Sequence, residues 1–205
     1  MLQFKPGDAL LIVDIQNDFL PGGSLGVPEG DQVIPLLNAD IKGAVTAGIP
    51  IIASRDWHPA NHISFIAQGG VWPTHCVQNT SGATFNKALH LPTTTIIINK
   101  AFKPDLESYT AWNGQSHLDG RTLPEILTEL GVKRLIIGGL ALDYCVKETA
   151  LDAIHHGLSV LVHLDATRAI TSEAGQAAID EMNTAGVSFF GNYQPPQLRK
   201  NLSPK

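Results

Sequence analysis

Apolar and polar positions follow one arrangement that recurs along the chain. Four times, a stretch with apolar residues at helical spacing ends at a Gly and is followed by a short, mostly β-branched apolar run. A Gly just past a helix supplies the left-handed conformation that ends it, and a continuous apolar run is typical of a strand buried on both faces. The pattern predicts helices over about 31–47, 122–130, 143–156 and 172–185, and strands over 49–52, 134–137, 159–162 and 187–190.

Two further apolar runs, at 10–13 and 95–98, bring the expected number of strands to six. Strands separated by helices imply right-handed crossovers and a mainly parallel sheet that is covered on both faces. The predicted fold class is therefore α/β, a doubly wound, three-layer domain that spans residues 1–193. Residues 194–205 are polar, hold three prolines, and are expected to form a C-terminal tail.

One segment breaks this rhythm. About 40 residues separate the strand that ends near Ser54 from the strand that begins near Thr94, and they show little helical periodicity. Loops of this length inside a compact domain are uncommon and tend to be functional. We therefore expect this loop to carry part of a site.

Composition narrows the class of protein. The chain has 205 residues, 43% of them hydrophobic and 16% charged, which suits one globular domain. A formal net charge of −5 without any basic run argues against nucleic acid and anionic membranes as partners. No apolar stretch approaches the roughly 18–20 residues that span a bilayer, and no secretion signal is evident, so we expect a cytoplasmic protein with Cys76 and Cys145 as free thiols.

Reactive side chains follow each of the first four predicted strands. Asp14 follows the first, Asp56 and His58 the second, Lys100 the third, and Cys145 lies in the turn after the fourth. Each has a structural alternative, because Asp14 can cap a turn, Lys100 can form an ion pair and Cys145 can pack as a small apolar residue. Ligands of open parallel sheets bind at the carboxyl ends of the strands, so the coincidence favours a site.

Cys145 is the candidate nucleophile. It stands where a loop turns into a helix, with Asp143 as the expected N-cap. A thiol in the first turn of a helix feels the positive end of the dipole, which lowers the pKa of the thiol and favours the thiolate.

A second cluster is rich in Asp and His. Asp56 and His58 are two positions apart and can face one ion, while His75 comes from the far end of the long loop and His62 is a fourth candidate. One carboxylate and two imidazoles, with water in the remaining positions, suit Zn²⁺, Fe²⁺ or Mn²⁺ in an open geometry. Solvated loop histidines, and a Trp72 that only anchors the loop, are the alternatives.

Five segments together form a more specific pattern than any single residue. They are VDIQNDF at 13–19, RDWHPANH at 55–62 with Ser64 and Phe65, WPTHCV at 72–77, Lys100, and GLALDYCV at 139–146. In this order, within about residues 9–161, they resemble the motifs of the nicotinamidases of the isochorismatase-like cysteine hydrolase superfamily. The resemblance implies the same doubly wound fold.

The resemblance also implies a role for each matched residue. The catalytic residues would be Asp14, Lys100 and Cys145, and the metal ligands Asp56, His58 and His75, with His62 behind them. The backbone N–H groups of Ala141 and Cys145 would form an oxyanion hole after a cis Leu140–Ala141 peptide, and Phe19, Trp72 and Tyr144 would wall a pyridine pocket. Leu142 stands where Thr is more usual, and Tyr109 matches only loosely.

The implied activity is hydrolysis of nicotinamide to nicotinate and ammonia through a Cys thioester, in NAD salvage, with pyrazinamide as a further substrate. One divalent transition metal per chain, zinc first and iron or manganese as alternatives, would orient the pyridine ring. The implied partner is the small-molecule substrate, and the chain would act as a monomer or a homo-oligomer.

Two other functions stay open. A metal-free cysteine hydrolase of the same superfamily that acts on a carbamoyl amide need not carry Asp56, His58 and His75, so the presence of all three favours the nicotinamidases. A non-enzymatic metal-binding or redox-sensing protein would instead oxidise Cys145 and pair it with Cys76. Steady release of ammonia from nicotinamide would exclude that reading.

Overall fold

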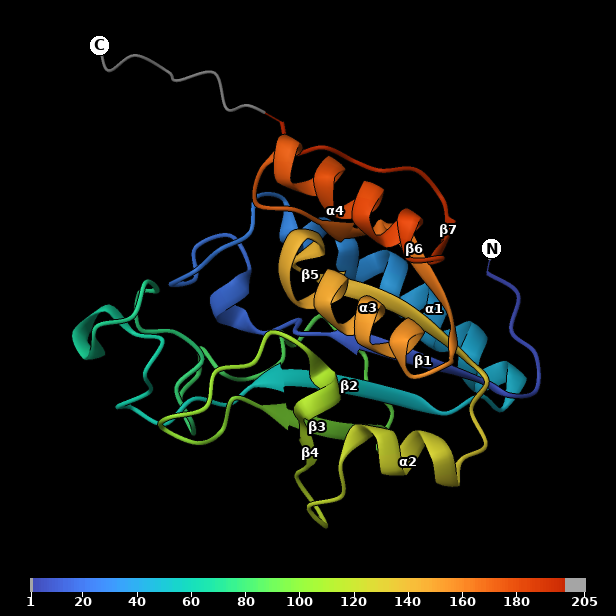
Figure 1. The fold of residues 1–205 in the computed structure, drawn as a ribbon, viewed down its shortest axis with the longest axis horizontal. Helices are drawn as coiled ribbons and strands as arrows, with labels where there is room; N and C mark the ends of the chain where they lie inside the picture. Colours follow the sequence, from blue (N-terminus) through green and yellow to red (C-terminus); the bar gives the residue numbers. More distant parts are fainter. Residues whose placement is uncertain (1, 198–205) are drawn as a thin grey trace.

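A seven-stranded sheet runs through the computed structural model, which describes residues 2–197 (Figure 1). The strands are β1 (Asp8–Val13), β2 (Ile51–Asp56), β3 (Ile96–Lys100), β4 (Gln115–Ser116), β5 (Arg134–Leu140), β6 (Ser159–Arg168) and β7 (Ser188–Phe190), in the order β4-β3-β2-β1-β5-β6-β7. All neighbours are parallel except β3 and β4. All six predicted strands are present, and the doubly wound fold is confirmed. The sheet has one strand more than predicted, because β4 is a polar two-residue edge strand without an apolar run.

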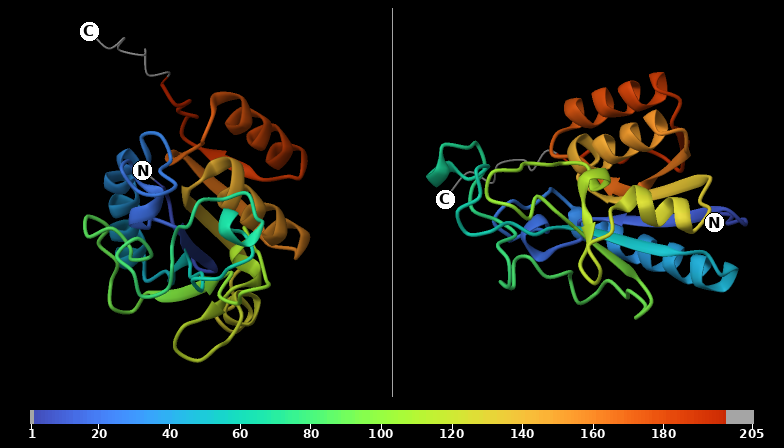
Figure 2. Two further views of the ribbon diagram at one scale, coloured as in Figure 1. Left: turned by 90° about the vertical axis from the view of Figure 1, so that its left-hand side faces the viewer. Right: turned by 60° about the horizontal axis from the view of Figure 1, so that its bottom comes forward.

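Helices cover both faces of the sheet. They are α1 (Ile34–Ala47), α2 (Leu123–Glu129), α3 (Lys147–His155) and α4 (Ser172–Thr184). α1 packs on one face, and α2, α3 and α4 pack on the other (Figure 2). The four predicted helices are confirmed, and the Gly that follows each of them has a positive φ, as its role in ending the helix requires.

The central strand β1 shows why the apolar runs are continuous. Ala9, Leu11 and Val13 belong to the core beneath α2, α3 and α4, whereas Leu10 and Ile12 belong to the core beneath α1. Every residue of β1 is buried, because successive side chains of a strand point to opposite faces and both faces here are covered.

The order of the strands reverses between β1 and β5. β2 and β3 lie on one side of this point and β6 and β7 on the other, so the carboxyl ends of β1 and β5 flank a crevice, where doubly wound sheets bind ligands. The left panel of Figure 2 looks onto this edge, which the long segment between β2 and β3 wraps. That segment contains a single short 3-10 turn, at Ile66–Gln68.

The remaining sequence expectations concern the ends of the chain and the membrane. Residues 194–197 adopt no regular secondary structure, and the rest of the predicted tail, residues 198–205, lies outside the described residues. Among residues 2–197, no helix is long and apolar enough to cross a bilayer.

The close approach of β5 to β1 predicts a large stability difference between two glycine substitutions. Gly139 has φ 130°, and a Cβ there would stand 2.1 Å from the carbonyl oxygen of Val13, whereas Gly48 has φ 67° and open space around it. We expect Gly48→Ala to lower the free energy of unfolding by about 1–2 kcal/mol through backbone strain, and Gly139→Ala by about 3 kcal/mol or more because overpacking adds to the strain. Urea denaturation measures both, and equal losses would contradict the packing of β5 on β1.

Candidate active site

Four strand ends bring four ionisable side chains together. Asp14 follows β1, Asp56 ends β2, Lys100 ends β3, and Cys145 lies in η5 (Leu142–Val146), the π-helical turn after β5. Lys100 Nζ lies 2.9 Å from Asp14 Oδ2 and 3.3 Å from Cys145 Sγ, and it also forms an ion pair with Asp56. The structure therefore joins the three residues assigned to catalysis by the resemblance, and connects them directly to Asp56.

Asp14 is completely buried, and its two oxygens have different surroundings. Ser54 Oγ donates a hydrogen bond of 2.8 Å to Oδ1. Oδ2 faces the Lys100 ammonium and has no regular hydrogen-bond partner among residues 2–197. Burial raises the pKa of the Asp14 carboxyl, although the positive charge of Lys100 opposes the shift. Oδ2 is therefore the oxygen available to accept a proton, on a carboxylate more basic than usual.

The surroundings of Cys145 match the sequence expectation in one respect and differ from it in two. Cys145 lies, as expected, in the first helical turn after β5, because η5 leads directly into α3. Asp143 does not cap this turn, because its carboxylate accepts the backbone N–H of Ile170 at 3.1 and 3.2 Å. Burial raises the pKa of the Cys145 thiol well above its ordinary value, and Lys100 offsets this only in part. The expected lowering of the thiol pKa is therefore wrong, and a nucleophilic role for this sulfur would require a neighbouring base to take its proton.

Lys100 carries the positive charge of the site. Its side chain is fully buried, which opposes ionisation, but the carboxylates of Asp14 and Asp56 outweigh burial and raise the pKa of Lys100 well above the ordinary value. The same ammonium, together with His58 and His75, overcomes the effect of burial on Asp56 and lowers the pKa of that carboxyl. Asp56 is therefore a charged carboxylate at the candidate metal site.

The Asp56, His58 and His75 side chains converge on one point. The Nε2 atoms of His58 and His75 lie 3.4 and 3.8 Å from Asp56 Oδ2, and the three candidate ligand atoms lie within 4.8 Å of one another. His58 Nδ1 contacts the Ala101 carbonyl oxygen at 3.1 Å and His75 Nδ1 the Pro73 carbonyl oxygen at 2.7 Å. A carbonyl can only accept, so each Nδ1 donates and each Nε2 keeps its lone pair.

One atom of this cluster has the surroundings expected of a metal ligand. His58 Nε2 is buried and has no hydrogen-bond partner in the part of the chain that the structure describes. An unpartnered buried acceptor is costly, and a cation at this point satisfies it. Burial lowers the pKa of His75, which favours the neutral imidazole that metals bind. The three residues thus fit a divalent transition metal with open coordination positions.

His62 stands behind the cluster, as expected. Its ring lies 4.2 Å from the ring of His58, but Nδ1 contacts Ser64 Oγ at 2.7 Å and Nε2 contacts the Leu106 carbonyl oxygen at 3.1 Å. Both ring nitrogens are therefore engaged away from the point where Asp56, His58 and His75 meet.

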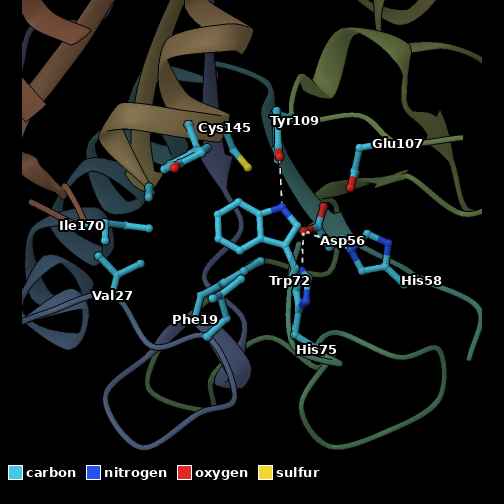
Figure 3. Close-up of a pocket in the computed structure, with 13 residues that line it drawn as sticks. Phe19, Val27, Asp56, His58, Trp72, His75, Glu107, Tyr109, Cys145 and Ile170 are labelled. Carbon is cyan, nitrogen blue, oxygen red and sulfur yellow. Dashed lines mark hydrogen bonds and ion pairs between the residues drawn. The ribbon is translucent and has the colours of Figure 1, made fainter. Parts of the chain in front are cut away.

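A pocket leads from the surface to Cys145 and to Asp56, His58 and His75 (Figure 3). Phe19, Trp72 and Tyr144 line it as the resemblance implies, and so do Ala141 and Cys145. The Trp72 ring meets the Tyr144 ring edge-on at 5.5 Å. Flat aromatic walls with polar groups at the inner end suit a small planar ring. The Leu140–Ala141 peptide is cis, as expected.

Part of the pocket lining was not predicted from the sequence. Leu25, Val27, Glu107 and Ile170 also line it, as does the loosely matched Tyr109, whose hydroxyl accepts a 2.9 Å hydrogen bond from Trp72 Nε1. Ile170 follows the end of β6 and so lies at the same sheet edge as the other groups. A survey of all parallel strand ends, rather than the first four, would have found it. Leu25, Val27 and Glu107 lie in loops whose paths no local pattern reveals.

The chain is similar to known proteins of the family whose motifs it carries. The family model of the isochorismatase domain matches residues 8–190. The nicotinamidase of Escherichia coli is 39% identical, over 90% of this chain and 95% of its own length. The crystal structure of a pyrazinamidase of Pyrococcus horikoshii in complex with zinc is 46% identical with a TM-score of 0.84, over 91% of this chain and all of the other.

A further solved structure carries a ligand. PnC1 from L. infantum in complex with nicotinate is 36% identical with a TM-score of 0.79, over 90% of this chain and 92% of that one. The resemblance inferred from five motifs is thus confirmed across most of the chain. With its doubly wound sheet and its family model matched from residue 8 to residue 190, the chain belongs to the isochorismatase domain family.

Proposed function

We propose that this chain is a nicotinamidase, which hydrolyses nicotinamide to nicotinate and ammonia through a thioester on Cys145 and also accepts pyrazinamide. The observation that carries the proposal is the contact of Lys100 with Asp14, Asp56 and Cys145, which joins a base and a thiol to a metal-binding cluster at the end of an aromatic pocket. The named activities of the relatives support it. The role we propose in the cell is cytoplasmic NAD salvage.

The first step is transfer of the thiol proton. Burial keeps the Cys145 thiol protonated at rest, and the same burial makes Asp14 a stronger base than an exposed carboxylate. In our proposal Asp14 Oδ2 takes the proton as the sulfur attacks the carboxamide carbon. Lys100 contacts both groups and stabilises the negative charge as it passes from the Asp14 carboxylate to the sulfur.

The attack makes a tetrahedral intermediate with a negative oxygen. We propose that the backbone N–H groups of Ala141 and Cys145 hold this oxygen, a contribution of about 3–4 kcal/mol for a well-placed donor. Asp14 then returns the proton to the leaving nitrogen, the C–N bond breaks, and ammonia departs from the thioester. A water molecule that gives a proton to Asp14 next attacks the thioester carbon. The C–S bond then breaks, nicotinate leaves, and Asp14 returns the proton to the sulfur so that the thiol re-forms.

Asp56, His58 and His75 set the orientation of the ring in this proposal. A divalent transition metal bound by them, zinc before iron or manganese, would be a Lewis acid that holds the pyridine nitrogen. Phe19, Trp72 and Tyr144 enclose the ring, so its carboxamide is directed at Cys145. Holding the carboxamide carbon close to the sulfur lowers the activation barrier, because less orientational freedom is lost during the reaction.

Substrate preference tests the proposal. The metal cluster and the aromatic walls favour a pyridine or pyrazine carboxamide over an acyclic carbamoyl amide. We expect kcat/KM for nicotinamide to exceed that for a ureido amide of similar size by roughly 100-fold or more, since the acyclic amide leaves the polar groups of the site unpaired. Ammonia release with each substrate measures the ratio. A preference for the ureido amide, or no ammonia from nicotinamide, would contradict the proposal.

Alanine substitutions at the two cysteines test which of them is the nucleophile. Cys76 is buried like Cys145, and burial also raises the pKa of its thiol, but it is the sulfur of Cys145 that lies 3.3 Å from Lys100 Nζ. We expect Cys145→Ala and Asp14→Asn each to lower kcat by about 10⁴-fold or more, as loss of a nucleophile or its base does, and Cys76→Ala to retain most of the activity. Circular dichroism checks that each variant folds. Substantial turnover by Cys145→Ala or Asp14→Asn would overturn the assignment.

A further inference from the structure

The hydrogen-bond ladder between β1 and β2 ends just before the site. Its last paired residues are Val13 and Ser54, and its last bond runs from the backbone N–H of Asp14 to the Ser54 carbonyl oxygen at 3.2 Å. Asp14 has φ 51°, and the chain turns away from β2 there. In a strand, every second residue directs its backbone groups to the same side. Asp56, two positions after Ser54, therefore still directs its N–H and C=O toward the place that β1 has left.

The side chain of Gln16 fills that place. Its Oε1 accepts the backbone N–H of Asp56 at 2.8 Å, and its Nε2 donates to the Asp56 carbonyl oxygen at 2.7 Å and to the Ala83 carbonyl oxygen at 3.0 Å. Gln16 is completely buried. A carboxamide offers the same donor and acceptor as a peptide group, so the side chain extends the ladder by one residue. Without it, two buried backbone groups of Asp56 would lose their partners.

The rest of the segment from Asp56 to His58 is held in the same complete way. The N–H of Trp57 donates to the Lys100 carbonyl oxygen at 3.1 Å, and its C=O accepts Gln78 Nε2 at 2.8 Å. The N–H of His58 donates to the Cys76 carbonyl oxygen at 3.0 Å, and its C=O accepts the N–H of Gln78 at 2.8 Å. All six backbone groups of this segment are paired, and both bonds at Asp56 come from the Gln16 side chain.

We propose that Gln16 is a positioning residue for the metal cluster: it fixes the backbone of Asp56 so that the carboxylate faces His58 and His75, and metal affinity depends on it. The inference rests on the proposed function in one respect, that Asp56, His58 and His75 bind a metal. Gln16 also follows Asp14 by two positions, so one short turn carries the proposed base and holds the proposed ligand. Groups that orient metal ligands commonly contribute 10- to 100-fold to affinity.

Zinc affinity of the metal-free protein tests this inference directly. Gln16→Met keeps the length of the side chain and removes all three hydrogen bonds. We expect its dissociation constant for Zn²⁺, measured by competition with a chromogenic chelator, to rise about 10- to 100-fold over that of the wild-type chain, which binds about one ion. The thermal midpoint of each metal-free protein, recorded alongside, reports on stability alone.

Asn38 offers the matched control. Its carboxamide also holds a loop through one donor and one acceptor. It donates to the Ala88 carbonyl oxygen and accepts the N–H of His90, both at 2.8 Å, and neither bond involves Asp56, His58 or His75. We expect Asn38→Leu to lower the thermal midpoint and to leave the Zn²⁺ affinity within about twofold of the wild type. If Asn38→Leu weakens Zn²⁺ binding as much as Gln16→Met does, affinity only follows stability and the proposal fails.

The remaining outcomes separate the two proposals. Wild-type affinity in Gln16→Met contradicts the positioning role and leaves the proposed function intact. A wild-type chain that binds no Zn²⁺ contradicts both the positioning role and the metal site of the proposed function, while nicotinamide hydrolysis is measured independently. Should Gln16→Met not fold, Gln16→Asn decides by the same comparison, because its shorter carboxamide cannot reach both backbone groups of Asp56.

Discussion

The buried ammonium of Lys100 is the interaction on which the site depends. An unpaired charge at such a position would cost several kcal/mol or more, and here the carboxylates of Asp14 and Asp56 compensate it. Because Lys100 also touches Cys145, the proposed nucleophile, its proposed base and the candidate metal ligands form one electrostatic unit. Removal of either carboxylate would disturb the charge that the other groups experience, so the two halves of the site cannot vary independently.

Much of the fold could be predicted from the sequence because its strands are buried on both faces. Continuous apolar runs and a Gly after each helix indicated six parallel strands, and parallel strands must direct their carboxyl ends to one edge. That constraint is why Asp14, Asp56, Lys100 and Cys145 could be grouped before any distance was known. β4 was not predicted because its two residues, Gln115 and Ser116, carry no apolar pattern.

The properties that sequence could not supply arise from contacts between distant segments. The pKa of Cys145 depends mainly on burial, which the local helix pattern does not reveal, so the expected thiolate was wrong. Gln16 stands inside a recognised motif, yet its bonds reach Asp56 and Ala83, 40 and 67 positions away. Pocket residues such as Val27 were missed for the same reason, since only the path of their loops brings them to the site.

Covalent capture of the acyl group is the decisive measurement for the proposed mechanism. In that mechanism the carbonyl carbon of nicotinamide is bonded to Cys145 Sγ between the two halves of the reaction. Intact-mass analysis of acid-quenched single turnovers, followed by peptide mapping, should find a transient mass gain of one nicotinoyl group on the peptide that contains Cys145, and none on the peptide that contains Cys76. Formation of nicotinate through a full turnover with no acylated protein at any time would contradict the account.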